Sequence, residues 1–100
     1  MNQPGNNSME PQAVVRELTV VNQWGLHGRA SAKLVQTARK FSADIWLVRE
    51  GVEVDCKSIL DVMTMACTQG TPVKIKARGD DAEAALNALT ELINSKFGEE

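Results

Sequence analysis

The only histidine of the chain, His27, stands in a setting that suits chemistry on phosphate. It lies between Gly25 and Gly28, has Arg29 two residues later, and precedes a helical pattern. The start of a helix presents free backbone N–H groups and the positive end of the dipole. Glycines allow close approach of the backbone, and a guanidinium can donate paired hydrogen bonds to phosphate oxygens. Together these features indicate an anion site that contains a nucleophilic imidazole.

In such a site a neutral imidazole nitrogen can accept a phosphoryl group. The backbone N–H groups of Gly28, Arg29 and Ala30, together with the Arg29 side chain, are the predicted phosphate-binding groups. The dipole contributes only about 0.3 to 1 kcal/mol at an exposed site, which suits a carrier that must release its group. The alternative for a lone histidine is a surface or capping side chain without a chemical role. Hydrolase chemistry has little support, because no acid is visibly linked to His27 and nothing activates Ser31.

A second candidate site is Ser58, which stands three residues before Asp61 at the spacing of a capping box. The simple interpretation is a helix N-cap, whose loss typically costs about 1 kcal/mol. A hydroxyl at a helix start is also a place where the fold tolerates a phosphate. Phosphorylation there adds a charge of about -1.5 to -2 at neutral pH, so Ser58 is a predicted regulatory site.

Three apolar residues follow Ser58 at spacings that can leave part of their surface exposed: Ile59, Leu60 and Met63. We predict that they form a partner-docking patch beside the regulatory serine. The alternative is that they belong to an ordinary core, and at least Val62 and one other apolar residue of this helix are expected to be buried.

Composition favours one globular domain and excludes several classes of protein. The chain has 100 residues, 43% hydrophobic and 24% charged, with a formal net charge of -2. Nothing in this balance indicates a nucleic-acid binder, and no apolar run is long enough to span a membrane. The polar start lacks a signal-peptide pattern. Cys56 and Cys67 are therefore expected to be reduced thiols in the cytoplasm, and no metal site is predicted.

Hydrophobic periodicity predicts an α/β two-layer open-faced sandwich with the element order β-α-β-β-α-β-α. The expected strands cover residues 14–21, 44–49, 52–55 and 71–78. A first helix follows Arg29 as far as Phe41, and a short second helix follows Ser58. A last helix opens at 79–81 and carries an apolar stripe of Leu86, Leu89, Ile93 and Phe97.

The strand over 71–78 alternates apolar residues with Lys74, Lys76 and Arg78, which predicts a solvated basic face. A protein that binds a small anion or RNA through this face is an alternative hypothesis. The stripe lacks interleaved aromatic residues, which argues against RNA binding.

Two separated segments resemble the HPr family, the histidine-containing phosphocarriers of the bacterial phosphotransferase system. The segment from Gly25 to Arg29 is similar to the family's active-site segment, and 57–63 is similar to its regulatory-serine segment. The segment 68–71 also fits, and the resemblance covers residues 14–96. It implies a four-stranded antiparallel sheet with three helices on one face. The expected division is a disordered tail over 1–12, an HPr-like domain over 13–97 and a C-terminal tail over 98–100.

The resemblance also implies a function, that of a phosphoryl carrier without a cofactor rather than a stand-alone enzyme. Enzyme I would phosphorylate Nδ1 of His27 with help from Arg29, and His27 would pass the group to an EIIA protein or domain. Ser58 would match the serine modified by HPr kinase/phosphorylase. The implied protein is a cytoplasmic monomer that binds no nucleic acid and does not insert into membranes. The alternative, from another class, is a regulatory HPr-like module that acts by docking under control of Ser58.

Three positions depart from the family pattern. Ala30 replaces the usual proline after the arginine, which removes a preset φ and restores a backbone N–H. Gly28 replaces a commoner alanine or threonine, and Trp24 stands where a short polar residue is usual. These departures affect the turn around His27 and the surface beside it, while His27 and Arg29 are intact.

Overall fold

A computed structural model of the chain describes residues 12–99, so residues 1–11 of the predicted tail lie outside the described residues. The four strands are β1 (Val14–Thr19), β2 (Asp44–Arg49), β3 (Val52–Asp55) and β4 (Pro72–Arg78). The helices are α1 (Gly28–Ala38), α2 (Ile59–Thr64), α3 (Ala82–Asn94) and a short 3-10 helix, η1 (Lys96–Gly98). The predicted order β-α-β-β-α-β-α is confirmed, with η1 added at its end.

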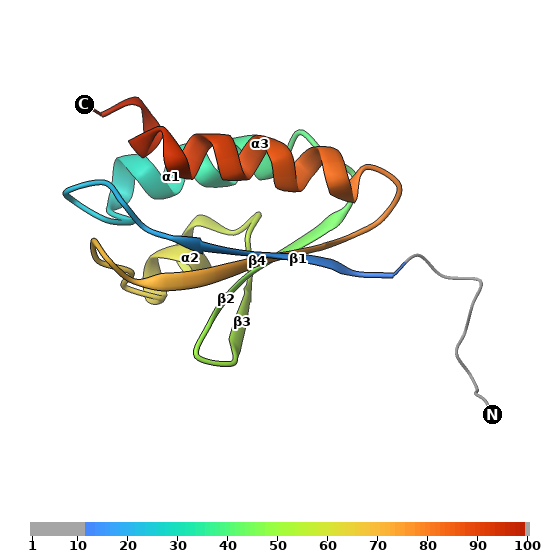
Figure 1. Cartoon of the computed structure of the whole chain (residues 1–100), viewed down its shortest axis with the longest axis horizontal. Coiled ribbons are helices and arrows are strands. Elements are labelled where there is room, and N and C mark those ends of the chain that lie inside the picture. Colours follow the sequence, from blue (N-terminus) through green and yellow to red (C-terminus); the bar gives the residue numbers. More distant parts are fainter. Residues whose placement is uncertain (1–11, 100) are drawn as a thin grey trace.

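The strands form one antiparallel sheet in the order β1-β4-β2-β3. Helices α1 and α3 lie over one face of this sheet (Figure 1), and α2 packs against α1 and β3. The space between the layers is filled by the apolar stripes of the helices, which include Leu34, Val35, Leu86 and Leu89, and by inward residues of the strands, which include Leu47 and Ile75. The expected open-faced sandwich is therefore confirmed.

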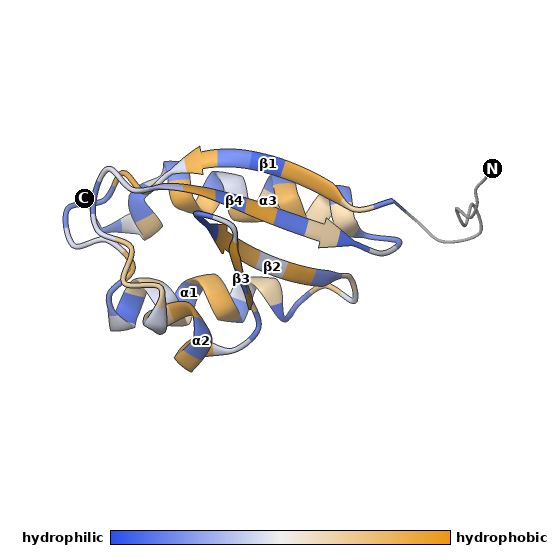
Figure 2. Cartoon of the chain, turned by 90° about the horizontal axis from the view of Figure 1, so that it is seen from below, coloured by the Kyte–Doolittle hydropathy of each residue, from blue (hydrophilic) through white to orange (hydrophobic). Residues whose placement is uncertain are grey.

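Bands of hydrophilic and hydrophobic residues follow one another along β1 and β4, as the colours of Figure 2 show for the strands seen from below. On β4 the residues alternate as predicted, with Val73, Ile75 and Ala77 buried. The basic residues do meet an aromatic ring here, because Lys76 Nζ lies 4.8 Å and Arg78 Cζ 5.5 Å from the centre of Trp46. Lys76 Nζ also donates to Glu53 Oε2 at 2.6 Å. The basic stripe is thus largely satisfied within the protein, which weakens the anion or RNA hypothesis.

The prediction that Phe97 continues the stripe of the last helix is wrong. α3 ends at Asn94, and Lys96, Phe97 and Gly98 have φ values of 59°, 57° and 73°. The backbone therefore leaves the helical path here, yet Phe97 is still only 1% exposed. Each left-handed residue other than glycine costs about 1 to 2 kcal/mol, and burial of the ring offsets part of this cost. Periodicity detected the apolar residue but not the turn, because the compensating contacts are tertiary.

The described C-terminal residues, up to Glu99, are part of the folded domain. Gly98, which the sequence analysis placed in a tail over 98–100, belongs to η1. Lys33 Nζ donates to the Phe97 carbonyl oxygen at 2.6 Å, and the Glu99 N–H donates to the Lys96 carbonyl at 3.0 Å. Glu100 lies outside the described residues. The described C-terminal residues are therefore held against α1.

One exposed position after α2 invites a stabilising substitution. Ala66 has φ 51°, the left-handed conformation that usually follows the end of a helix and favours glycine. Ala66→Gly is expected to raise the free energy of unfolding by about 0.5 to 1 kcal/mol. Glycine removes the strain of a Cβ in the left-handed conformation, and this gain exceeds the loss of stability that comes from the higher conformational entropy of its unfolded chain. Urea denaturation measures the change.

A matched control is Ala84→Gly, at an exposed position with helical conformation in α3. There the same exchange should lower the stability by about 0.5 to 1 kcal/mol. A drop in stability for Ala66→Gly similar to that of the control would contradict the strain argument.

Candidate functional site

The loop from Val20 to Leu26 places His27 at the start of α1. The Leu26 N–H donates to the Cys67 carbonyl at 2.8 Å, and the Gly70 N–H donates to the Val20 carbonyl at 2.7 Å. Both bonds tie this loop to the segment that follows α2. Gly25 has φ +63°, and its Cα faces the Cys67 carbonyl so closely that a Cβ would lie 2.4 Å from that oxygen. The loop therefore needs glycine at position 25 for two separate reasons.

His27 is the N-cap of α1, as its place before the helical pattern suggested. Its Nδ1 accepts a hydrogen bond from the Arg29 N–H at 3.3 Å, and its carbonyl accepts from the Ser31 N–H at 2.8 Å. A nitrogen that accepts a hydrogen bond carries no proton, so the ring proton lies on Nε2. The imidazole is one-third exposed. The lone pair available for chemistry is thus on Nδ1, at the positive end of the α1 dipole.

The other ring nitrogen meets a carboxylate that the sequence analysis did not identify. His27 Nε2 lies 2.5 Å from Glu99 Oε2, across 72 residues of sequence. Asn22 is fully buried, and its Nδ2 donates to Glu99 Oε1 at 3.0 Å and to the Gly25 carbonyl at 2.8 Å. The hydrogen bonds from Asn22 and then from His27 hold the pKa of Glu99 below its usual range. Glu99 is therefore a carboxylate at neutral pH.

The predicted phosphate-binding groups come together at the start of α1. Arg29 is exposed, and among residues 12–99 its guanidinium makes no hydrogen bond or ion pair. Ala30 is buried in the core, so a small side chain fits there. A Cβ at Gly28 would meet no atom within 4 Å, which means that packing does not require the glycine. The first N–H groups of a helix lack intrahelical acceptors and can bind an anion.

Ser58 is the N-cap of α2, as predicted. Its Oγ accepts a hydrogen bond from the Asp61 N–H at 3.3 Å. The Ser58 side chain is partly exposed, so its hydroxyl lies at the helix start with access to solvent. The hydrogen bond by which Ser58 caps the helix therefore also fixes its hydroxyl at the start of α2.

The predicted docking residues are exposed in the free chain. Leu60 is 73% exposed, and Ile59 and Met63 are exposed beside it, whereas Val62 is fully buried and Met65, just past the helix, is also buried. A six-residue helix that buries one of its apolar residues leaves an apolar patch on the surface. We call Ile59, Leu60 and Met63 the α2 patch.

The α2 patch and His27 lie on neighbouring elements. The segment after α2 contacts the His27 loop through the bond between Leu26 and Cys67, and α1 packs against α2. Trp24, in the His27 loop, adds a further exposed apolar side chain. The structure thus brings the two predicted sites onto adjoining segments.

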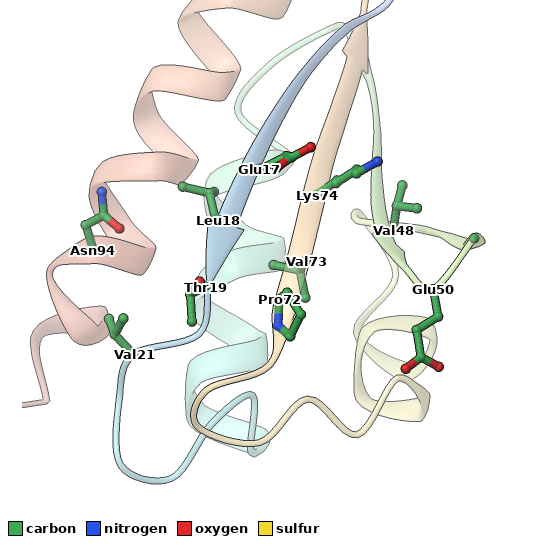
Figure 3. A pocket seen from close by; sticks show the side chains of 11 residues that line it. Glu17, Leu18, Thr19, Val21, Val48, Glu50, Pro72, Val73, Lys74 and Asn94 are labelled. Atoms are coloured by element: carbon green, nitrogen blue, oxygen red, sulfur yellow. The ribbon is translucent and has the colours of Figure 1, made fainter.

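Other candidate nucleophiles and cavities do not form a second site. Burial raises the pKa of the Cys56 thiol to about 12 and also raises that of Cys67, so both remain thiols. A cleft of about 780 Å³ is lined mainly by residues of β1, β4 and the end of β2 (Figure 3). It includes Lys74 of the basic stripe but none of the residues predicted for the His27 and Ser58 sites. Within residues 12–99 there is no cluster of potential metal ligands and no helix long and apolar enough to cross a membrane.

Comparisons with known proteins agree with this fold. The family described as PTS HPr component phosphorylation site matches residues 14–95. The phosphocarrier protein HPr of Xylella fastidiosa strain Temecula1 is 48% identical over 84 residues, which cover 84% of this chain and 94% of that protein. A crystal structure of HPr-C-His from Thermoanaerobacter tengcongensis is similar with a TM-score of 0.84 and 46% identity, covering 87% of this chain and 98% of that one.

A phosphocarrier HPr from Bacillus anthracis is also similar, with a TM-score of 0.78 and 37% identity over 81% of this chain and 96% of that one. An open-faced sandwich of this topology is the fold of these phosphocarrier proteins, and in this chain His27 is the N-cap of α1. The chain belongs to the HPr family, the phosphocarriers of the phosphotransferase system.

Proposed function

We propose that the chain carries a phosphoryl group on Nδ1 of His27, taking it from phosphorylated Enzyme I and giving it to an EIIA protein or domain. The observation that supports this most strongly is the hydrogen bonding of the imidazole, which leaves the lone pair on Nδ1 at the start of α1. In the forward step the Nδ1 lone pair forms the bond to phosphorus. The bond between phosphorus and the donor atom breaks, and the donor keeps that electron pair. The second transfer is the reverse process with EIIA as acceptor.

The start of α1 supplies the groups that hold the phosphoryl oxygens. The Arg29 N–H donates to Nδ1 at 3.3 Å, which is long for a hydrogen bond between nitrogen atoms and easily exchanged. When Nδ1 bonds to phosphorus, this N–H turns to a phosphoryl oxygen, joined by those of Gly28 and Ala30. The Arg29 guanidinium is free to approach from solvent. This binding is modest in strength, and a carrier must release what it holds.

The test is incubation of the full chain with Enzyme I and phosphoenolpyruvate. We expect one phosphoryl group per chain, labile in acid and stable in alkali, as a phosphoramidate is. Subsequent addition of an EIIA protein should remove the label. An absence of transfer, or a label that survives acid, would contradict the proposal.

The expected setting follows from the same proposal. The chain acts in the cytoplasm as a monomer, without a cofactor, and its partners are Enzyme I, EIIA and a serine kinase of the HPr kinase/phosphorylase type. Nucleic acid is not among the proposed partners, and the pairing of Lys76 with Glu53 and Trp46 agrees with that.

Ser58 is proposed to regulate the first transfer. A phosphate on its hydroxyl stands at the start of α2, next to the α2 patch. A partner that covers this apolar patch must then desolvate a doubly charged group, which opposes docking. The helix itself tolerates the charge, because the dipole favours an anion at this end.

The Ser58→Asp variant is expected to keep a melting temperature close to that of the wild type, since aspartate is an equally good N-cap. Its second-order rate constant for phosphorylation by Enzyme I should fall by roughly tenfold or more, a cost of about 1.4 kcal/mol or more in docking. Stopped-time labelling measures the rate. Ser58→Asn is the control, because it keeps a neutral cap and should react like the wild type. Equal rates for the aspartate variant and the wild type would contradict the docking argument.

A second candidate is a regulatory module that acts by docking. The exposure of Leu60 and its neighbours favours it. An acid-stable label from a serine kinase, without any transfer from Enzyme I, would support this function over the carrier.

A further inference from the structure

We propose that Glu99 is a positioning residue for phosphoryl transfer: its carboxylate holds the His27 imidazole in the Nε2–H form and orients the Nδ1 lone pair toward the incoming phosphorus. This inference rests on the proposed function and adds a residue from the end of the chain to the site. The contact that carries it joins Nε2 of His27 and Oε2 of Glu99 at 2.5 Å.

The geometry leaves one arrangement of protons. An ionised carboxylate can only accept, so the hydrogen between Glu99 and His27 lies on Nε2. On the opposite side of the ring, Nδ1 accepts from the Arg29 N–H. Rotation of the ring by half a turn would break both contacts. The two hydrogen bonds therefore determine the tautomer and the plane of the imidazole together.

The carboxylate is itself held in place before any partner arrives. Its side chain is only 10% exposed, and Asn22 Nδ2 donates to Oε1 at 3.0 Å. The amide orientation of Asn22 is determined by its two acceptors, Glu99 Oε1 and the Gly25 carbonyl. The buried Phe97 ring anchors the preceding turn, and Lys33 holds its carbonyl. A group supported in this way orients its neighbour with little further loss of entropy.

The carboxylate also compensates the charge that develops during transfer. As Nδ1 bonds to phosphorus, the ring becomes cationic and Nε2 retains its proton, so no proton leaves in this step. The Glu99 carboxylate then faces a positive ring across a charge-assisted hydrogen bond. When the phosphoryl group departs, the electron pair returns to Nδ1 and the neutral Nε2–H form is restored. Glu99 thus acts in both directions of the relay.

The Glu99→Gln variant tests the role with little change in shape. A glutamine presents one oxygen and one NH2 group to two donors, Asn22 Nδ2 and His27 Nε2–H, and cannot satisfy both. Glu91→Gln is the control, since it removes the same charge from an exposed position on α3. Glu99→Asp is a second variant, which keeps the charge but shortens the reach.

The first readout is the 15N NMR spectrum of the His27 ring at a pH where the imidazole is neutral. We expect the wild type and Glu91→Gln to show the Nε2–H pattern, and Glu99→Gln to show an increased share of the Nδ1–H form. The second readout is the rate of phosphorylation by Enzyme I, which should fall about tenfold in Glu99→Gln. Glu99→Asp should recover part of the tautomer preference and part of the rate.

The outcomes separate this proposal from the function on which it rests. A wild type that accepts phosphate, with tautomer and rate unchanged in Glu99→Gln, overturns the role of Glu99 alone. A wild type that accepts no phosphate overturns the carrier function, and the NMR comparison still decides whether Glu99 controls the tautomer. A slower Glu99→Gln with an unchanged tautomer overturns the positioning mechanism.

Discussion

The His27→Ala variant is expected to receive no phosphoryl group from phosphorylated Enzyme I. His27 is the only histidine of the chain, so no second imidazole can take its place. Both cysteine thiols have raised pKa values and are buried, and no hydroxyl at this site is paired with a base. Mass spectrometry of the intact protein after incubation with Enzyme I and phosphoenolpyruvate measures the result.

The same variant removes an N-cap, so a control for folding is needed. Alanine cannot accept the Arg29 N–H, and the loss should cost about 0.5 to 1 kcal/mol of stability. His27→Asn keeps a capping acceptor without an imidazole and should unfold close to the wild type. It should nevertheless remain unlabelled. A labelled His27→Asn protein would show that the phosphoryl group resides elsewhere.

The second large effect is expected from Gly25→Ala, in the loop before His27. The added Cβ would lie 2.4 Å from the Cys67 carbonyl oxygen and 2.9 Å from Thr68 Cα, both backbone atoms that cannot turn aside. The φ of +63° adds strain for any L side chain. Relief requires the loop to leave the Cys67 segment and break the hydrogen bond of Leu26. We expect a loss of about 2 to 4 kcal/mol in the free energy of unfolding.

The Gly25→Ala variant should also transfer phosphate more slowly. A displaced loop moves the imidazole away from the start of α1, and an error of about 1 Å can cost roughly 100-fold in rate. Urea denaturation and the Enzyme I assay measure the two effects. Gly28→Ala is the matched control, because a Cβ there meets nothing within 4 Å. It lies next to His27 in the sequence and should change stability by less than about 0.5 kcal/mol. Similar losses in the two variants would contradict the steric explanation.

Local patterns predicted much of this protein. The alternation on β4 and the stripe of α1 are consequences of one buried face, which repeats at the period of the strand or helix. The Ser58 cap depends on residues three apart. The candidate site at His27 could be proposed for the same reason, since its glycines, its arginine and the helix start are contiguous in the chain.

The backbone around Phe97 is a feature that local patterns did not predict. Its spacing from Ile93 is that of a helical stripe, and it is buried as the stripe implies. The backbone nevertheless turns left-handed at Lys96. That turn is stabilised by the burial of the ring and by Lys33, and neither contact is visible in the local sequence.

By itself the sequence determined the strands and the three main helices, their buried faces, the Ser58 cap and the candidate nucleophile, because each depends on residues a few positions apart. The tertiary structure alone decided the strand order β1-β4-β2-β3 and the meeting of Glu99 with His27. Both depend on how the layers pack and on where the left-handed turn after α3 directs the end of the chain. Such contacts are stabilised by interactions between residues that are far apart in the sequence, so local sequence patterns do not predict them.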